Sequence, residues 1–185
     1  MKLRWFGTSL VILMLSAGCS SVRVADHEGG LSYYEGAFEY ATLDSTIKTH
    51  VVGSPFYKFG PAFAESVTAT MTGATRGRKV TFISSPQNDA RHEFHVVVIF
   101  NGKNSLTERD ICESASPADT IRSLQTTKMF AVFCHGDHPL SYSSGLVDGV
   151  KADMEPLFHQ LVKEVTLGMI PGYDDQRSSG INIFP

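Results

Sequence analysis

The stretch "TKMFAVFCHGDHPLSYSSGLV", Thr127–Val147, carries the clearest signal of how this chain folds. Two runs rich in aromatic and β-branched residues flank "HGD", and Gly136 supplies the positive backbone angle that a tight turn needs. The stretch therefore predicts a β-hairpin. A tight hairpin pairs its strands antiparallel, so we expect an antiparallel sheet to be the centre of the fold.

The segment after the hairpin has a helical period. One apolar face is predicted to contain Met154, Leu157, Phe158, Leu161, Val162, Val165 and Met169. Asp153 is expected to cap this helix, and Gly168 and Pro171 to mark its end. A second helix is predicted from Pro61 to Met71, because apolar residues there recur every four positions.

Four further segments read as strands: "LSYYEGAFEYAT", "STIKTHVVG", "KVTFIS" and "EFHVVVIF". The chain from Asn101 to about Thr127 is polar and is expected to be irregular. Strands therefore follow one another along the chain, which favours antiparallel pairing. The predicted fold class is α+β: a mostly antiparallel sheet of about five to six strands with two amphipathic helices packed on one face.

The N-terminus, "MKLRWFGTSLVILMLSAGCSS", has the build of a signal peptide. Lys2 and Arg4 precede an apolar run from Val11 to Leu15, and small residues lead to Cys19. The apolar run is far shorter than the roughly 20 residues of a membrane-spanning helix. We therefore expect residues 1–18 to direct export and then to be removed.

"SAGC" resembles the bacterial lipobox, in which the Cys receives a lipid and becomes the new N-terminus. The resemblance implies that Cys19 is lipidated, with palmitate among its acyl chains, although Ser16 stands where that pattern prefers Leu. Ser20 in place of Asp implies the inner leaflet of the outer membrane, facing the periplasm. The alternative is cleavage by an ordinary signal peptidase, which would release a free secreted protein.

The expected organisation is a signal peptide at 1–18, a lipid-anchored tether at 19–30, one α+β domain at 31–171 and a flexible tail at 172–185. The 185-residue chain has a formal net charge of −3, which becomes −5 when the two cations of the signal peptide are removed. Such a charge argues against nucleic acid as a partner. The predicted partners are the membrane, through the lipid, and an envelope protein.

The chain has three cysteines. With Cys19 assigned to the lipid, Cys112 and Cys134 remain as a pair in an oxidising compartment, where a disulfide is the expected state. Two unpaired, buried thiols are the alternative.

Three short motifs resemble catalytic or metal-binding sites, but each is better explained as a turn or a strand end. "HEFH", His92–His95, lacks the spacing of a zinc protease and reads as a solvated strand end. "GATRGRK", from Gly73, departs from a phosphate-binding loop and reads as a cationic turn. "CHGDH" offers His135, Asp137 and His138 but no second ligand cluster. We therefore predict no catalytic residue, no metal and no cofactor.

The segments "VVGSPFYKFGPAFAESVTATM", "FHVVVIFNG", "ICES", "TKMFAVFCHGDHPLSYSSG" and "FHQLVKEVTLGMIPG" resemble a group of proteobacterial envelope proteins to which no activity is assigned. The resemblance covers about Val51 to Pro171. The function expected from the sequence is a lipid-anchored, non-catalytic binding or assembly module in the periplasm. The alternative is a small envelope hydrolase with an unrecognised active site.

Overall fold

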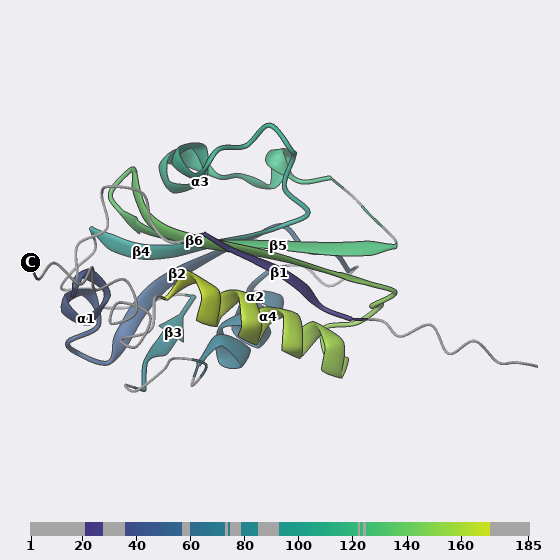
Figure 1. The fold of residues 1–185 in the computed structure, drawn as a ribbon, viewed down its shortest axis with the longest axis horizontal. Helices are drawn as coiled ribbons and strands as arrows, with labels where there is room; N and C mark the ends of the chain where they lie inside the picture. The colour runs from purple at the N-terminus through teal and green to yellow at the C-terminus, as the bar shows by residue number, and fades with distance from the viewer. Residues whose placement is uncertain are drawn as a thin grey trace, which may run out of the picture.

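The computed structural model describes residues 21–27, 36–56, 60–72, 74, 79–84, 93–121, 123 and 125–170. Within these ranges the chain forms one six-stranded sheet with helices on both sides (Figure 1). No helix in the described part is long and apolar enough to cross a membrane.

The sheet has the strand order β1-β6-β5-β4-β2-β3. The strands are β1 (Arg23–His27), β2 (Thr46–Val52), β3 (Thr81–Ile83), β4 (Phe94–Phe100), β5 (Thr126–His135) and β6 (His138–Asp148). The pairs β1/β6, β6/β5 and β5/β4 are antiparallel, whereas β2 pairs in parallel with both β4 and β3. The predicted α+β class with a mostly antiparallel sheet is confirmed, and the parallel pairs are the departure from simple hairpins.

The hairpin predicted within Thr127–Val147 is present in the structure. His135 pairs with His138 at the end of β5 and β6, and Gly136 has a φ of 57° in the turn between them. A register shift between Phe133 and Cys134 marks a β-bulge just before the turn. These two long strands are central in the sheet, so the hairpin does organise the fold.

Helices α2 (Pro61–Met71) and α4 (Pro156–Met169) cover one face of the sheet, which we call the α2/α4 face (Figure 1). The bounds of α2 agree with the prediction. In α4 the predicted apolar face is buried from Phe158 onward. Met154 departs from that prediction, because it precedes the helix and its side chain is 82% exposed. The N-cap is Glu155, not Asp153.

Aromatic rings fill the space under α2 and α4. Phe158 of α4 lies 5.6 Å from Phe100 of β4, and Phe63 of α2 lies 5.4 Å from the same ring. Gly145 lets α4 approach β6 closely, since an added Cβ would lie 2.7 Å from Val165 Cγ2 and 2.8 Å from Leu161 Cδ1. The α2/α4 face is thus a tightly packed core.

Three local expectations are wrong. Residues 23–27 were expected in the tether but form β1, because Val22 and Val24 alternate onto the core. "AFEYA" was expected in a strand but forms helix α1 (Ala37–Ala41), with Ala37, Phe38 and Ala41 buried on one helical face. The segment after Asn101 was expected to be irregular but contains α3 (Glu108–Ser114) and the 3₁₀ turn η1 (Pro117–Asp119).

Candidate functional site

The two faces of the sheet are covered unequally. The α2/α4 face carries two long helices, whereas on the opposite face the described residues place only part of the connection between β4 and β5, residues 101–121, which we call the α3 segment (Figure 1). The sheet surface beneath it, which we call the α3 face, includes His50, His95, Val97, Phe130 and Val132. Because a short segment cannot cover a six-stranded sheet, concave surface remains on both sides of α3.

Backbone hydrogen bonds join the two ends of the α3 segment, residues 101–103 and 119–121, which we call its neck. Gly102 and Thr120 form an antiparallel bridge, Lys103 N donates to Asp119 O at 2.8 Å, and Ile121 N donates to Asn101 O at 2.6 Å. The chain thus leaves the sheet and returns to it at nearly the same place.

Two capping boxes order the segment above the neck. The Thr107 hydroxyl accepts from Asp110 N, while an Asp110 carboxylate oxygen accepts from Thr107 N at 2.9 Å. The Thr107 backbone N–H and the Thr107 hydroxyl both donate to the Asp110 carboxylate, and these hydrogen bonds lower the pKa of Asp110. Ser116 and Asp119 form the same arrangement at η1. Each box satisfies backbone groups that would otherwise need water.

A disulfide fixes α3 to the middle of the sheet. Cys112 of α3 and Cys134 of β5 are bonded, with 2.00 Å between the sulfurs and 5.8 Å between the Cα atoms. Cys134 is fully buried, and Ile111 packs beside the bond on Val97 and Val132. The predicted pairing of Cys112 with Cys134 is therefore present in the structure.

The larger concave site, which we call the His cleft, lies between α3 and the β2 side of the sheet. Its volume is about 830 Å³, and its polar lining residues are His50, Ser54, Ser84, His95, Glu113, Ser114 and Thr120. Gly53, with a φ of 72°, permits one wall of the cleft, because an added Cβ would lie 2.6 Å from Thr120 Cγ2. The ring centroids of His50 and His95, on neighbouring strands, are 5.6 Å apart.

Both imidazoles are held towards their neutral form. Burial lowers the pKa of His50 below its ordinary value of 6.5, and the charge of Lys48 adds to the effect. Burial is also the main cause that lowers the pKa of His95, and the charges of His50 and Lys48 lower it further. Hydrogen bonds with the backbone of Cys112 and Glu93 have the opposite effect and raise this pKa. At neutral pH the cleft therefore presents two uncharged imidazoles, each able to donate and accept a hydrogen bond.

His95 corrects the interpretation of "HEFH". The side chain was expected at a solvated strand end, but it is half-buried against His50 because its strand position points towards α3. No hydrogen bond joins either cleft imidazole to a serine hydroxyl or to a carboxylate among the described residues, and both nearby cysteines are oxidised. The described part of the cleft thus holds no assembled pair of nucleophile and base.

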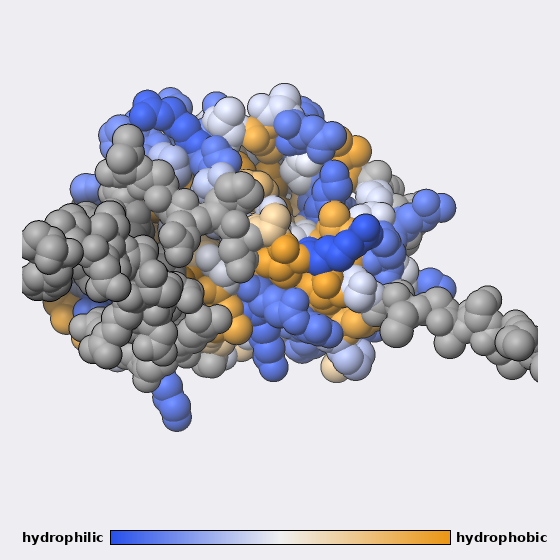
Figure 2. Space-filling view, viewed as in Figure 1, coloured by the Kyte–Doolittle hydropathy of each residue, from blue (hydrophilic) through white to orange (hydrophobic). Residues whose placement is uncertain are grey.

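The smaller site, which we call the cationic groove, lies on the other side of α3, over β4, β5, β6 and β1. Its volume is about 420 Å³. Its apolar lining includes Ile99, Leu106, Ile111, Phe130 and Leu146, and its cations are Arg23, Lys103 and Lys128. In Figure 2, apolar surface is visible between the α3 segment at the top and β1 in the centre, beside hydrophilic residues.

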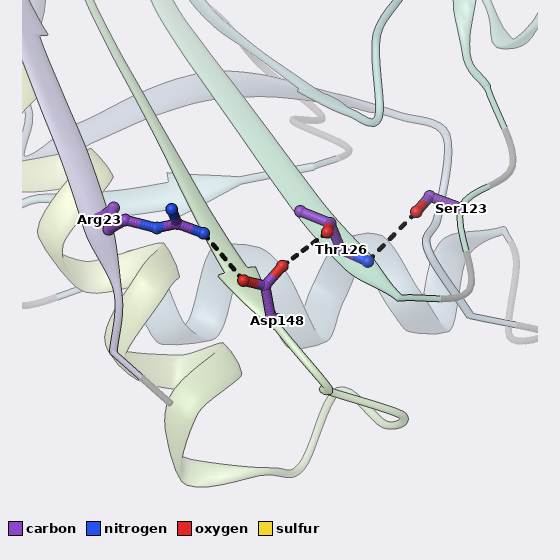
Figure 3. Close-up of polar contacts among 4 residues, drawn as sticks. All are labelled: Arg23, Ser123, Thr126 and Asp148. Carbon is purple, nitrogen blue, oxygen red and sulfur yellow. Dashed lines mark hydrogen bonds and ion pairs between the residues drawn. The ribbon is translucent and has the colours of Figure 1, made fainter. Parts of the chain in front are cut away.

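A polar cluster anchors the β1 end of the groove (Figure 3). Arg23 Nη2 lies 2.8 Å from Asp148 Oδ2, and the Thr126 hydroxyl donates to Asp148 Oδ1 at 2.6 Å. Thr126 N in turn donates to the Ser123 hydroxyl at 3.2 Å. Asp148 of β6 therefore connects the edge strand β1 with the beginning of β5, and it positions Arg23 at the rim.

The remaining sequence predictions fall in three groups. "HGDH" is the predicted turn: His138 Nε2 lies 3.3 Å from Asp137 Oδ1 at the surface, and no group of three metal-ligating side chains occurs in the described residues. Cys19, His92 and the tail 172–185 lie outside the described residues. So do residues 75–78 of "GATRGRK".

The sequence analysis did not predict the two concave sites, although part of the signal was present. "TERD" at Thr107–Asp110 and "SPAD" at Ser116–Asp119 have the spacing of capping boxes and would have predicted an ordered segment. Lys48 and His50 alternate with Ile47 and Thr49 along β2, which marks one strand face as polar.

Comparison with known proteins shows limited likeness. No family model and no curated protein matches the chain. Among solved structures, the PelC dodecamer from Paraburkholderia phytofirmans aligns with a TM-score of 0.41 and 12% identity, over 81% of this chain and 100% of that chain. A single-substitution variant of that PelC aligns with a TM-score of 0.40 and 11% identity, over 80% and 97% of the two chains. Values this low assign no function to the present chain.

Proposed function

We propose that this protein is a binding module of the cell envelope that is anchored by a lipid on Cys19 and uses the α3 face of its sheet to hold its ligand or partner. The observation that carries the proposal is the pair of concave sites, the His cleft and the cationic groove, on either side of α3. The opposite face is packed with α2 and α4, and the first turn of α2, at Pro61 and Ala64, also lines the His cleft.

The disulfide supports both the location and the role. Disulfides persist in oxidising compartments such as the periplasm. Here the bond between Cys112 and Cys134 holds the common wall of the two sites in place, so that a ligand meets a preformed surface. Preformed walls reduce the ordering cost of binding.

Photo-crosslinking in the cells that make the protein tests the binding face. A photoreactive phenylalanine analogue is placed at Ser114 in the His cleft, at the exposed Asn104 on the rim of the cationic groove, and at Lys163 on the exposed side of α4 as the matched control. We expect adducts from the first two positions and none from the third. Intact mass then distinguishes a small molecule from a protein. Adducts from Lys163 alone would contradict the proposal.

The lipid anchor has its own test. Metabolic labelling with a fatty-acid analogue should tag the wild-type protein and leave Cys19→Ala unlabelled, because the thiol is the expected site of attachment. Equal labelling of the two proteins would exclude Cys19 as that site and favour the alternative of a secreted protein.

A hydrolase remains the second candidate, because of one observation: the neutral imidazoles of the exposed His50 and the half-buried His95 lie side by side in the His cleft. A neutral imidazole is a competent general base. If the His cleft were catalytic, turnover of chromogenic esters would be lost in His95→Asn and retained in His138→Asn, which changes an exposed histidine in the hairpin turn. The binding module predicts no turnover by any of the three proteins.

A further inference from the structure

We infer that the cationic groove binds a single-chain anionic amphiphile, a long-chain fatty acid or a molecule with the same acyl chain and carboxylate. This inference rests on the proposed binding role of the α3 face and adds the class of ligand for one of its two sites. The acyl chain lies along the apolar floor, and the carboxylate lies at the rim near Lys128.

The floor of the groove suits an acyl chain. Phe130 of β5 and Leu146 of β6 form it from below, and Leu106 and Ile111 of the α3 segment close it from above. The volume of about 420 Å³ falls within the roughly 300–1,000 Å³ typical of small-molecule sites. A chain of methylene groups gains by leaving water for such a surface.

The rim selects for negative charge. Arg23, Lys103 and Lys128 line the groove, whereas no Asp or Glu does, although the chain as a whole has 19 acidic residues against 16 basic ones. An excess of cations at one site of an acidic protein is a local feature of that site.

The three cations are not equivalent. The Arg23 guanidinium is paired with Asp148 at 2.8 Å, and Lys103 Nζ lies 3.7 Å from Asp119 Oδ1. Lys128 Nζ instead donates to the amide oxygen of Asn104 at 3.4 Å, a long contact to an uncharged group. Lys128 is therefore the cation best able to exchange its present contact for a ligand carboxylate, with Lys103 as second donor.

Other ligand classes fit less well. A neutral chain would gain nothing from the two lysines, and a bare phosphate would gain nothing from the apolar floor. The His cleft differs in both respects, because Glu113 and two neutral imidazoles line it and no Lys or Arg does. Of the two sites, it is the groove that combines an apolar floor with a cationic rim.

Displacement of a fluorescent fatty acid tests the inference. The full chain carrying Cys19→Ala is titrated with cis-parinaric acid, so that neither an attached lipid nor detergent is needed, and the probe is then displaced by palmitate. We expect saturable binding, and displacement by hexadecanol that is at least about tenfold weaker than by palmitate, since the alcohol lacks the charge that the lysines attract.

Three variants locate the site. Lys103→Glu with Lys128→Glu should weaken palmitate binding at least about tenfold, because attraction becomes repulsion. Ser144→Phe should abolish binding by filling the floor between β1 and β5. Lys163→Glu, the matched charge reversal on α4, should leave affinity unchanged, and thermal melts of all variants verify that each is folded.

Equal affinity for hexadecanol and palmitate would overturn the role of the charge, and unchanged binding by folded Ser144→Phe would place the ligand elsewhere. If palmitate does not bind but the photoreactive residue at Asn104 still crosslinks in cells, the amphiphile inference fails and the binding role of the α3 face stands. If the α3 face gives no crosslink either, the proposed function fails with it.

Discussion

The α2/α4 face and the α3 face are formed by alternate residues of the same strands, yet they differ in the size of their side chains and in what covers them. On the α2/α4 face, Phe100, Phe133 and Phe158 are fully buried within one large cluster. On the α3 face a smaller cluster of Val, Ile and Cys residues lies under one short helix. Bulky residues and long helices fill the space between helix and sheet, whereas a short covering segment leaves concave surface beside it that can bind.

The means of attachment differ as well. Burial of apolar area holds α2 and α4, whereas α3 is held by a covalent bond, two capping boxes and the pairing at its neck. Local devices of this kind fix a segment without burying much apolar surface beneath it. Changes on the α2/α4 face should therefore affect folding, and changes on the α3 face should affect mainly the sites.

The largest expected effect is on the α2/α4 face. Leu161→Asp places a charge in a position that is fully buried under α4, which should destabilise the protein by about 4 kcal/mol or more and prevent folding. Lys163→Ala, two residues away on the exposed side, should change the free energy of unfolding by less than about 0.5 kcal/mol. Urea unfolding measures both, and equal stability of the two variants would show that α4 is not part of the core.

Removal of the disulfide should have an intermediate effect. Cys112→Ala with Cys134→Ala should lower the free energy of unfolding by about 3 kcal/mol, since the bond closes a loop over a sequence separation of 22. Amide hydrogen exchange should accelerate in α3 more than in α4, because the bond touches only the α3 face. In the untreated protein neither thiol should react with a maleimide, and a labelled Cys134 before reduction would contradict the pairing.

Two neighbours on β6 compare the faces within a single strand. Gly145→Ala should cost about 1–3 kcal/mol, because its Cβ would lie within 2.8 Å of both Val165 and Leu161 on α4. The side chain of Ser144 lies on the opposite face, in the groove. Ser144→Ala should therefore lower the free energy of unfolding by less than about 0.5 kcal/mol. Thermal melts of the two variants measure the difference. If both variants lost the same free energy of unfolding, α4 would be able to move away from the added methyl group without loss of packing.

The elements that the sequence predicts correctly are those with a strong local period. Helices α2 and α4 and the hairpin of β5 and β6 each show their pattern within about twenty residues. The position of β2 between β3 and β4 is different, because its parallel pairs join segments far apart in the chain and leave no mark in either strand alone. Strand β1 is too short for its alternation to stand out.

The candidate site is harder to predict than the fold, because it too depends on contacts between segments that are far apart in the chain. Cys112 and Cys134 could be paired from compartment and count alone, since only two thiols remain once Cys19 is assigned. The contact between His50 and His95 joins two residues that are 45 positions apart in the chain, and the groove combines residues from four strands and the α3 segment. Such cavities exist only after the strands have been ordered in space.

The smallest expected effect is a titration on the α3 face. Because burial lowers the pKa values of His50 and His95 below 6.5, the folded protein binds fewer protons than the unfolded chain between the folded pKa and 6.5. Their contribution to stability should therefore be complete above pH 6.5 and decline as the pH falls through that window. NMR titration should place both midpoints below 6.5, and Lys48→Gln should raise them slightly by removing a nearby positive charge. The larger cause, burial, would remain in that variant, so midpoints at or above 6.5 in the wild-type protein would mean that the His cleft is open to water and that α3 does not cover it.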